Sequence, residues 1–209
     1  MVRTRALLAD GFLDLVLGSR CVVCNRTGRP LCATCRSELP AEAHAHWPTP
    51  TPAGLVAPYA VGDYDAALRA LVIAHKERRV LALAAPLGRL LASSVAAGLR
   101  GTTGPAVLVP VPSRPATVRR RGHDPTDAMT RIAARHAAAS DVRVARLLRQ
   151  RPGVVDQAGL DSAARAANLA GSMAAPADAV RRLAHHLPHA HVVICDDVLT
   201  TGATLREAQ

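Results

Sequence analysis

Unbroken apolar runs and helical hydrophobic periodicity organise most of the chain. Residues 106–111 and 192–195 are continuously apolar, which is typical of strands buried on both faces of a parallel sheet. Apolar residues recur at helical spacing in 65–75, and the long apolar segment within 80–99 predicts a buried helix with a proline in its first turn or at a break. Strands that alternate with helices predict an α/β domain built on a parallel sheet.

Weaker patterns complete this alternation and mark an N-terminal region. A strand near 55–61, a helix at 126–138 and a strand at 142–148 fit between the stronger elements. Residues 5–17 have the apolar spacing of a short amphipathic helix, and residues 40–53 have the Pro/Ala/Thr composition of a linker. We therefore expect a small N-terminal module followed by the α/β domain.

Four of the five cysteines lie in two CxxC pairs near the N-terminus. Seven residues separate Cys21 and Cys24 from Cys32 and Cys35. Two such pairs can place four thiolates at tetrahedral positions around Zn²⁺, in a site that is closed to substrate. The alternatives are two disulfides, which a reducing cytoplasm disfavours, and a redox pair, which would need a flanking βαβ unit. The pattern predicts a structural zinc site without Cys195, which belongs to a buried strand.

Two carboxylates and a hydroxyl-rich loop follow the last apolar strand. Asp196 and Asp197 suit the hydroxyls of a ribose or a Mg²⁺ ion, whereas the first turn of the next helix suits a phosphate. Gly202 would let the main chain approach that phosphate closely. The alternative is an ordinary turn whose threonines only cap a helix. The loop consists of Val198, Leu199, Thr200, Thr201, Gly202, Ala203 and Thr204.

A basic loop follows the first of the two apolar strands. It contains Arg119, Arg120 and Arg121, and arginines bind polyanions well because their planar groups donate several hydrogen bonds. If the sheet is parallel, this loop and the loop after Asp197 leave the same sheet edge, so the arginines would face the same ligand. A merely solvated basic loop is the alternative.

Five motifs in this order resemble the ComF family, the competence-protein-F-like homologues of type I phosphoribosyltransferases. They are the two CxxC pairs, the segment Tyr64-Asp65…Leu68-Arg69…Lys76, and the stretches VPVPSRPATVRRRG, DQAGLDSAARAANLAG and VVICDDVLTTGAT. The chain departs from the family pattern in two places. The motif Gly-Phe-Asn-Gln is replaced by Gly122 with His123, Asp124 and Pro125, and the chain stops at Gln209, before a further strand of the family.

The resemblance implies a zinc module in residues 1–53 and a phosphoribosyltransferase-like domain in residues 54–209 that lacks its C-terminal strand. It implies 5-phosphoribosyl-1-pyrophosphate (PRPP) or ribose 5-phosphate as the ligand, bound with Mg²⁺ at the strand-end loop. Asp196, Asp197 and Lys76 would be the catalytic residues, and Lys76 and the three arginines would contact pyrophosphate. The resemblance also implies a link to the DNA-uptake machinery, and the acceptor of the phosphoribosyl group is not identified.

Composition adds a strong preference for anions. The formal net charge is +10 with 26 lysines and arginines, which predicts attraction to phosphates, pyrophosphate and nucleic acid. Aromatic residues make up only 2% of the chain, so few rings could stack on single-stranded DNA. No signal peptide or membrane insertion is predicted, and we expect a cytoplasmic protein. A single-stranded-DNA-binding competence factor and a PRPP-sensing regulator are the alternatives to an enzyme.

Overall fold

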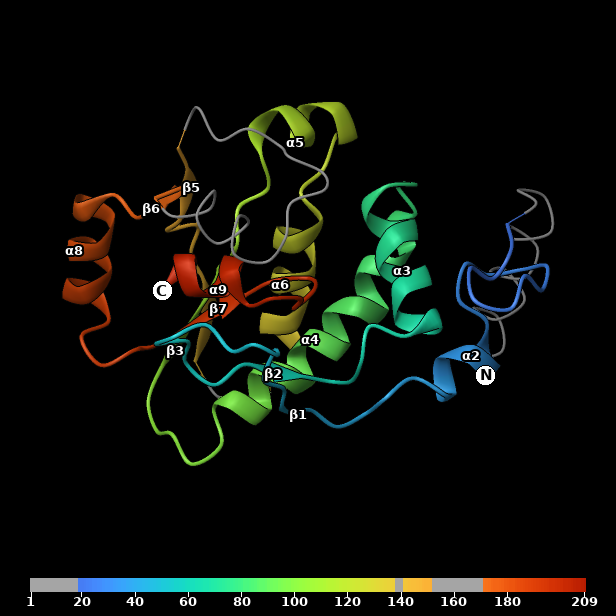
Figure 1. The fold of residues 1–209 in the computed structure, drawn as a ribbon, viewed down its shortest axis with the longest axis horizontal. Coiled ribbons are helices and arrows are strands. Elements are labelled where there is room, and N and C mark those ends of the chain that lie inside the picture. The colour runs from blue at the N-terminus through green and yellow to red at the C-terminus, as the bar shows by residue number, and fades with distance from the viewer. Residues whose placement is uncertain (1–18, 138–140, 152–170) are drawn as a thin grey trace, which may run out of the picture.

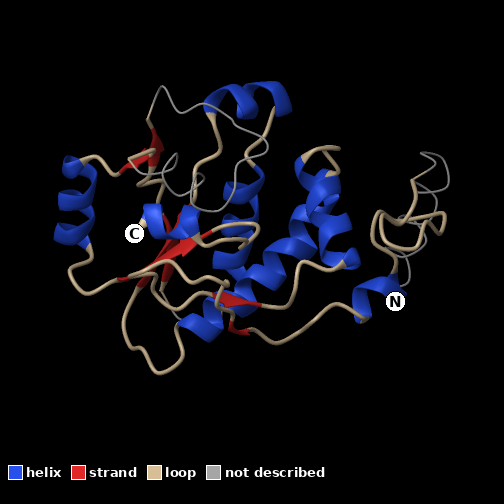
Figure 2. Ribbon diagram, in the orientation of Figure 1, coloured by secondary structure: helices blue, strands red, loops and turns tan. Residues whose placement is uncertain are grey.

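The structure is a computed structural model that describes residues 19–137, 141–151 and 171–209. At its centre lies a three-stranded parallel sheet with helices around it (Figures 1 and 2). The strand order is β4 (Val142–Val144), β3 (Ala106–Pro110) and β7 (His191–Cys195). The predicted α/β class with a parallel sheet is confirmed.

The two apolar strands differ in burial. β3 is buried along its whole length, as predicted, because it lies between β4 and β7. β7 lies at an edge of the described sheet, and Val192 in it is 56% exposed. The prediction that both faces of β7 are buried is therefore wrong. An apolar run does not report whether its strand is central or at an edge.

Three predicted helices are confirmed near their expected bounds: α3 (Ala66–Lys76), α4 (Ala84–Gly98) and α6 (Pro125–His136). α4 and α6 pack closely at Gly88, where an added Cβ would lie 2.5 Å from Cβ of Ile132. A side chain at this position would push the two helices apart, so the glycine allows their close contact.

The apolar segment 80–99 forms the short 3₁₀ helix η1 (Leu81–Leu83) and then α4. Pro86 lies in the first turn of α4, where its missing N–H breaks no helical hydrogen bond. By length and composition alone, Leu81–Gly98 is apolar enough to cross a membrane, and 33% of this span is buried inside the structure. The prediction of a buried helix thus holds for one face of α4 only.

The segment that was predicted as a linker contains part of a second sheet. Within it, β1 (His44–Ala45) pairs antiparallel with β2 (Tyr59–Ala60), and Ala43 is only 1% exposed. Residues 40–53 are therefore not simply a linker, and the strand expected near 55–61 shortens to β2. Two-residue strands are too short to produce a recognisable alternation in the sequence.

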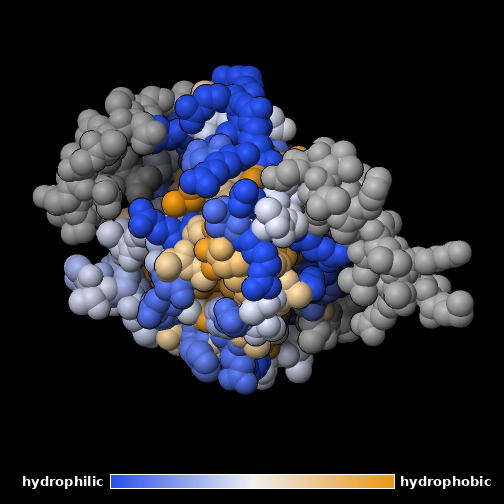
Figure 3. Space-filling view, turned by 90° about the vertical axis from the view of Figure 1, so that its right-hand side faces the viewer, coloured by the Kyte–Doolittle hydropathy of each residue, from blue (hydrophilic) through white to orange (hydrophobic). Residues whose placement is uncertain are grey.

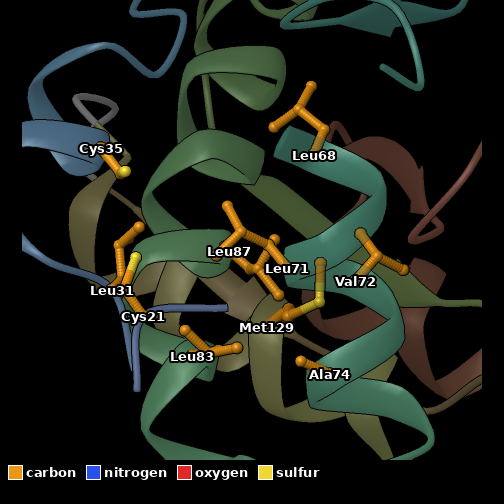
Figure 4. Packing of buried hydrophobic residues seen from close by; sticks show 10 residues of the cluster. All are labelled: Cys21, Leu31, Cys35, Leu68, Leu71, Val72, Ala74, Leu83, Leu87 and Met129. Carbon is orange, nitrogen blue, oxygen red and sulfur yellow. The ribbon is translucent and has the colours of Figure 1, made fainter. Parts of the chain in front are cut away.

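The N-terminal module packs against the helices of the α/β part. It contains α2 (Ala33–Ser37), and its Cys21 and Leu31 belong to the same hydrophobic cluster as Leu71 of α3 and Leu87 of α4 (Figure 4). On the face of the molecule that lies at the right-hand side of Figure 1, apolar residues form a central area with hydrophilic residues around it (Figure 3). The module and the helices therefore share a hydrophobic core.

The basic segment that was predicted as a loop is a helix, α5 (Pro115–Arg121). Pro115 occupies its first turn, and Gly122 ends it in the left-handed conformation with φ of 77°. Proline at the start and glycine after the end are ordinary helix boundary signals, so the sequence contained this information.

Other elements had no counterpart in the sequence analysis. α8 (Ala177–His186) lies in a segment for which no element was predicted, and it has no buried residue. β5 (Arg149–Gln150) and β6 (Met173–Ala174) pair antiparallel. The strand expected at 142–148 is confirmed only over Val142–Val144. The chain ends in α9 (Ala203–Ala208). The expected helix at 5–17 and the motif residues 156–170 lie outside the described residues.

Candidate functional site

The four cysteines of the CxxC pairs form one cluster. The sulfur atoms of Cys21, Cys24, Cys32 and Cys35 all lie within 4.8 Å of one another, and no disulfide joins them. Sγ of Cys24 and Sγ of Cys32 are 3.7 Å apart, close to the separation of about 3.8 Å that Zn–S bonds impose at tetrahedral corners. The cluster is therefore compatible with binding a metal such as zinc.

Backbone groups around the cluster favour thiolates. The amide of Cys32 donates to Sγ of Cys21, and the amide of Cys35 donates to Sγ of Cys32, each at 3.5 Å. Burial opposes ionisation of Cys21, but amide donors and the neighbouring Cys24 outweigh it and lower its pKa to about 6. Hydrogen bonds with Cys24 and Cys32 raise the pKa of Cys35 instead.

Cys195 lies apart from this cluster. It is the last residue of β7 and is 1% exposed. Burial raises its pKa to about 12, so its thiol is protonated and unreactive at neutral pH. The assignment of Cys195 to the strand is confirmed.

The register of the parallel sheet brings the two predicted loops together. Pro110 at the end of β3 lies opposite Cys195 at the end of β7, and the amide of Val111 donates to the carbonyl oxygen of Cys195 at 2.8 Å. The chain leaves both strands at the same sheet edge. The segment that leads into α5 and the loop after Cys195 therefore start side by side, as predicted.

Lys76 contacts the acidic pair directly. Its Nζ donates to Oδ2 of Asp197 at 2.6 Å, although the two residues are 121 positions apart in the sequence. The Asp197 side chain is 6% exposed and the Lys76 side chain 34%. Burial lowers the pKa of Lys76, but the charge of Asp197 and its hydrogen bond more than compensate and raise it overall. The only lysine of the chain is thus held beside the predicted ribose acids.

Asp196 and Asp197 have different environments. The amide of Asp197 donates to Oδ1 of Asp196 at 2.8 Å. Burial and the adjacent charge of Asp197 raise the pKa of Asp196 to about 8. Burial therefore favours the protonated form of Asp196, whereas Asp197 forms an ion pair with Lys76.

The basic helix α5 is connected to the C-terminal end of α3. Arg121 forms an ion pair with Glu77, and Arg79 donates to the carbonyl oxygen of Arg120. Arg119 and Arg120 have exposed side chains, whereas Arg121 is mostly covered. Of the three predicted arginines, two therefore face solvent and the third stabilises the position of α5.

His123 and Asp124, which follow Gly122, lie next to this connection. Nε2 of His123 lies 3.2 Å from the carbonyl oxygen of His75, and the two imidazole rings are 5.4 Å apart. His75 is 1% exposed, and burial lowers its pKa. Asp124 accepts a hydrogen bond from the amide of Asp127 and caps α6. Sequence analysis gave no role to these residues.

The glycine of the strand-end loop is also constrained by packing and backbone conformation. Gly202 has a positive φ of 74°, and an added Cβ would lie 3.0 Å from side-chain atoms of Leu55 and Pro48. Close packing against the 48–55 segment and the left-handed backbone thus account for this glycine. Oγ1 of Thr201 accepts a hydrogen bond from the amide of Ala203 at 3.4 Å, but the N-cap of α9 is Gly202, and no side chain caps this helix.

An ion-pair cluster around the buried Asp127 was missed by the sequence analysis. Asp127 of α6 accepts hydrogen bonds from Arg131 at 2.8 Å and from Arg146 at 2.6 and 2.7 Å. These hydrogen bonds and the two positive charges outweigh burial and lower the pKa of Asp127. The spacing of Asp127 and Arg131 could have indicated the first pair, but only the fold brings Arg146 to the second.

Comparisons of the chain with family models, with curated proteins and with solved structures found no match.

Proposed function

We propose that the chain binds PRPP or ribose 5-phosphate at the sheet edge where β3 and β7 end. The observation that carries this proposal is the hydrogen bond between Lys76 and Asp197 at that edge. It brings Lys76 from a distant part of the chain to the two adjacent acids of the motif, Asp196 and Asp197. Such crevices beyond the carboxyl ends of parallel strands are the usual ligand sites of α/β proteins.

Each part of the ligand has a matching set of residues. Asp196 and Asp197 accept hydrogen bonds from the ribose hydroxyls, and the loop from Thr200 to Thr204 holds the 5-phosphate. Lys76 and the exposed Arg119 and Arg120 of α5 contact the pyrophosphate. The oxygen donors of the acidic pair also suit Mg²⁺, which would neutralise charge on the pyrophosphate when bound.

We further propose that the bound PRPP reacts with an acceptor. The bond between ribose C1 and the pyrophosphate oxygen breaks, the pyrophosphate leaves with the electron pair, and C1 forms a bond to the acceptor. Basic side chains lower the barrier because negative charge grows on the leaving group. The chain would then be a phosphoribosyltransferase of the kind that the ComF-like motifs imply.

The four-cysteine cluster complements this site as a structural element. We propose that it holds one Zn²⁺ ion that stabilises the N-terminal module and takes no part in chemistry, because four thiolates leave no open coordination position. The burial of Cys21 and Cys35 in the core shared with α3 and α4 supports this role.

Ligand-induced thermal stabilisation tests the proposed function. PRPP with Mg²⁺ should raise the Tm of the wild type, since a ligand at 100 times its Kd adds about 2.7 kcal/mol of stability. The double variant Asp196→Asn/Asp197→Asn should fold but show no such shift. Asp141→Asn/Asp178→Asn, which removes two acids elsewhere, is the matched control and should respond like the wild type. An unchanged response of the first variant would refute the ribose role.

A second candidate function is binding of single-stranded DNA. The observation that favours it is the exposure of Arg119 and Arg120 on α5 in a chain of net charge +10. Binding of this kind depends on phosphate contacts, so its affinity should fall steeply with salt. An oligonucleotide titration at 50 and 200 mM salt tests it, and the absence of binding at the lower salt would exclude it.

A further inference from the structure

The basic helix α5 stands away from the three-stranded sheet. It lies at the top of the molecule in Figure 1, and none of its residues is buried. It carries Arg119 and Arg120, the exposed arginines of the proposed pyrophosphate site. A short helix without a buried face is held in position mainly by the contacts at its ends. The contacts at the end of α5 therefore decide where these two arginines lie.

Three polar contacts join the end of α5 to the segment 75–79. They are the ion pair of Arg121 with Glu77, the hydrogen bond from Arg79 to the carbonyl oxygen of Arg120, and the contact of His123 Nε2 with the carbonyl oxygen of His75. His75 and Glu77 are the two sequence neighbours of Lys76. The end of α5 is thus attached on both sides of the lysine that pairs with Asp197.

Both ring nitrogens of His123 point at carbonyl oxygens. Nε2 lies 3.2 Å from the carbonyl oxygen of His75, and Nδ1 lies 3.4 Å from that of Arg121. A neutral imidazole donates from one nitrogen only, so one lone pair then faces an oxygen lone pair. An imidazolium donates from both nitrogens, and hydrogen bonds from a charged donor are the stronger ones. The arrangement is therefore complete only when His123 is protonated.

The neighbouring His75 is placed to remain neutral when His123 is charged. It is 1% exposed, its Nδ1 lies 3.4 Å from the carbonyl oxygen of Val80, and its Nε2 has no hydrogen-bond partner among the described residues. Burial and the nearby His123 lower the pKa of His75. Because the two rings are 5.4 Å apart, a second charge would be repelled, so the contact has room for one proton.

The charged and titratable groups around His123 come from α3, α5, α6 and the segment after β7. They are His75, Lys76, Glu77 and Arg79, then Arg119, Arg120 and Arg121, then Asp124 and Asp127, and finally Asp196 and Asp197. Arg121 and Lys76 are neutralised by Glu77 and Asp197. Within the described part of the chain no carboxylate pairs with His123, so the two carbonyl oxygens are the acceptors for its protons.

We propose that His123 is a positioning residue for the pyrophosphate site and that its protonated ring clamps α5 to the two neighbours of Lys76. The positioning role rests on the proposed function, whereas the clamp is a property of the fold. Histidine changes its charge between pH 5 and 8, so the clamp has two donated hydrogen bonds at the acid end of this range and one at the alkaline end. Arg119 and Arg120 are then presented to the ligand most firmly at mildly acidic pH.

Amide hydrogen exchange of the ligand-free, zinc-loaded chain tests the clamp. The amides of Val118 and Gly122 donate to the carbonyl oxygens of Arg114 and Val118, so they report on the integrity of α5. After correction for the intrinsic rate, their protection should fall about threefold or more from pH 6 to pH 8. His123→Phe keeps an aromatic ring without nitrogens and should show low protection at both pH values. A wild type whose protection does not change with pH would overturn the clamp.

Titration of PRPP with Mg²⁺ tests the positioning role. PRPP itself titrates in this range, so the measured quantity is the ratio of the wild-type affinity to the variant affinity at each pH. For His123→Phe this ratio should be about tenfold at pH 6 and about threefold at pH 8. His189→Phe, which changes an exposed histidine elsewhere, is the matched control and should keep a ratio of one. An equal ratio for His123→Phe at both pH values would contradict positioning by the protonated ring.

A second variant keeps the test valid if the phenylalanine impairs folding. His123→Gln supplies an amide donor whose charge does not change with pH, so it should bind PRPP about equally well relative to the wild type at pH 8 and clearly less well at pH 6. A pH-independent ratio for this variant would again overturn the proposal. If no PRPP binds at either pH while the exchange results hold, the positioning role falls with the proposed function, and the clamp alone stands.

Discussion

The four-cysteine cluster and the strand-end site are built in different ways. The cluster takes all its side chains from one short stretch, Cys21 to Cys35, and brings four sulfurs within 4.8 Å of one another. The strand-end site joins Lys76 to Asp197 across 121 positions of sequence. The first arrangement is specified by local spacing, whereas the second requires the complete sheet register. We therefore expect damage to the cluster to affect stability and damage to the strand-end site to affect ligand binding.

The largest expected effect comes from the cluster. Cys21→Ser should remove the metal and lower the stability by about 4 kcal/mol or more, which corresponds to a Tm lower by roughly 8–16 °C. Metal analysis and thermal melts measure both consequences. Cys195→Ala is the control, since it removes a thiol outside the cluster and should retain one zinc per chain. A zinc content that is unaffected by Cys21→Ser would show that the cluster is not the metal site.

Asp196→Asn should change how the stability of the fold depends on pH. The pKa of Asp196 rises from 3.8 to about 8 on folding, so the folded chain is stabilised by the bound proton. This stabilisation is fully present below pH 4 and is lost as the pH rises towards 8. The variant should therefore match the wild type in stability at acid pH and exceed it by several kcal/mol at pH 8.

Urea unfolding of both proteins at pH 5 and pH 8 checks this prediction. Asp141→Asn, which changes a partly exposed acid on another part of the surface, serves as the control. A wild type whose stability does not decrease between these pH values would contradict the proposed environment of Asp196.

Lys76→Met should affect both stability and ligand binding. It leaves the carboxylate of Asp197 without its partner, which should cost about 2 kcal/mol because Lys76 is one-third exposed and the pair is partly screened. The additional change Asp197→Asn should restore most of this loss, since it removes the unpaired charge. PRPP affinity should remain impaired in both variants. Thermal melts and PRPP titrations separate the two effects, and a lack of restoration would argue against a direct ion pair.

The smallest effect should come from the exposed arginines of α5. Arg119→Ala/Arg120→Ala should weaken PRPP binding about tenfold, or 1.4 kcal/mol, without a change in Tm. Arg121 is left intact because it pairs with Glu77. The control Arg135→Ala/Arg181→Ala removes the same charge from two other exposed positions. A loss of oligonucleotide affinity with unchanged PRPP affinity would favour the DNA-binding function.

The sequence predicted what local patterns encode. The CxxC spacing indicated the cysteine cluster, and apolar runs indicated β3 and β7 and their shared edge. It could not show that β7 lies at a sheet edge, because periodicity carries no information on strand order. The partners of Lys76 and Asp127 were also unpredictable, since tertiary packing alone brings Asp197 and Arg146 to them.

One difference between the predicted and the observed fold, the helix α5, arose although its boundary signals are present in the sequence. Pro115 and Gly122 mark the two ends of α5, yet the segment between them was predicted as a loop. The packing of Gly202 against Leu55 could not be inferred, because the contact joins segments far apart in the chain. The contact of His123 with α3 likewise exists only in the folded chain.

Calorimetric titration of PRPP into the zinc-loaded wild type in the presence of Mg²⁺ tests the central claim most directly. The strand-end site predicts saturable binding with one ligand per chain, and the same titration into Lys76→Met should show a clearly weaker interaction. A folded wild type that produces no binding heat with PRPP at millimolar concentration would contradict the assignment of this site.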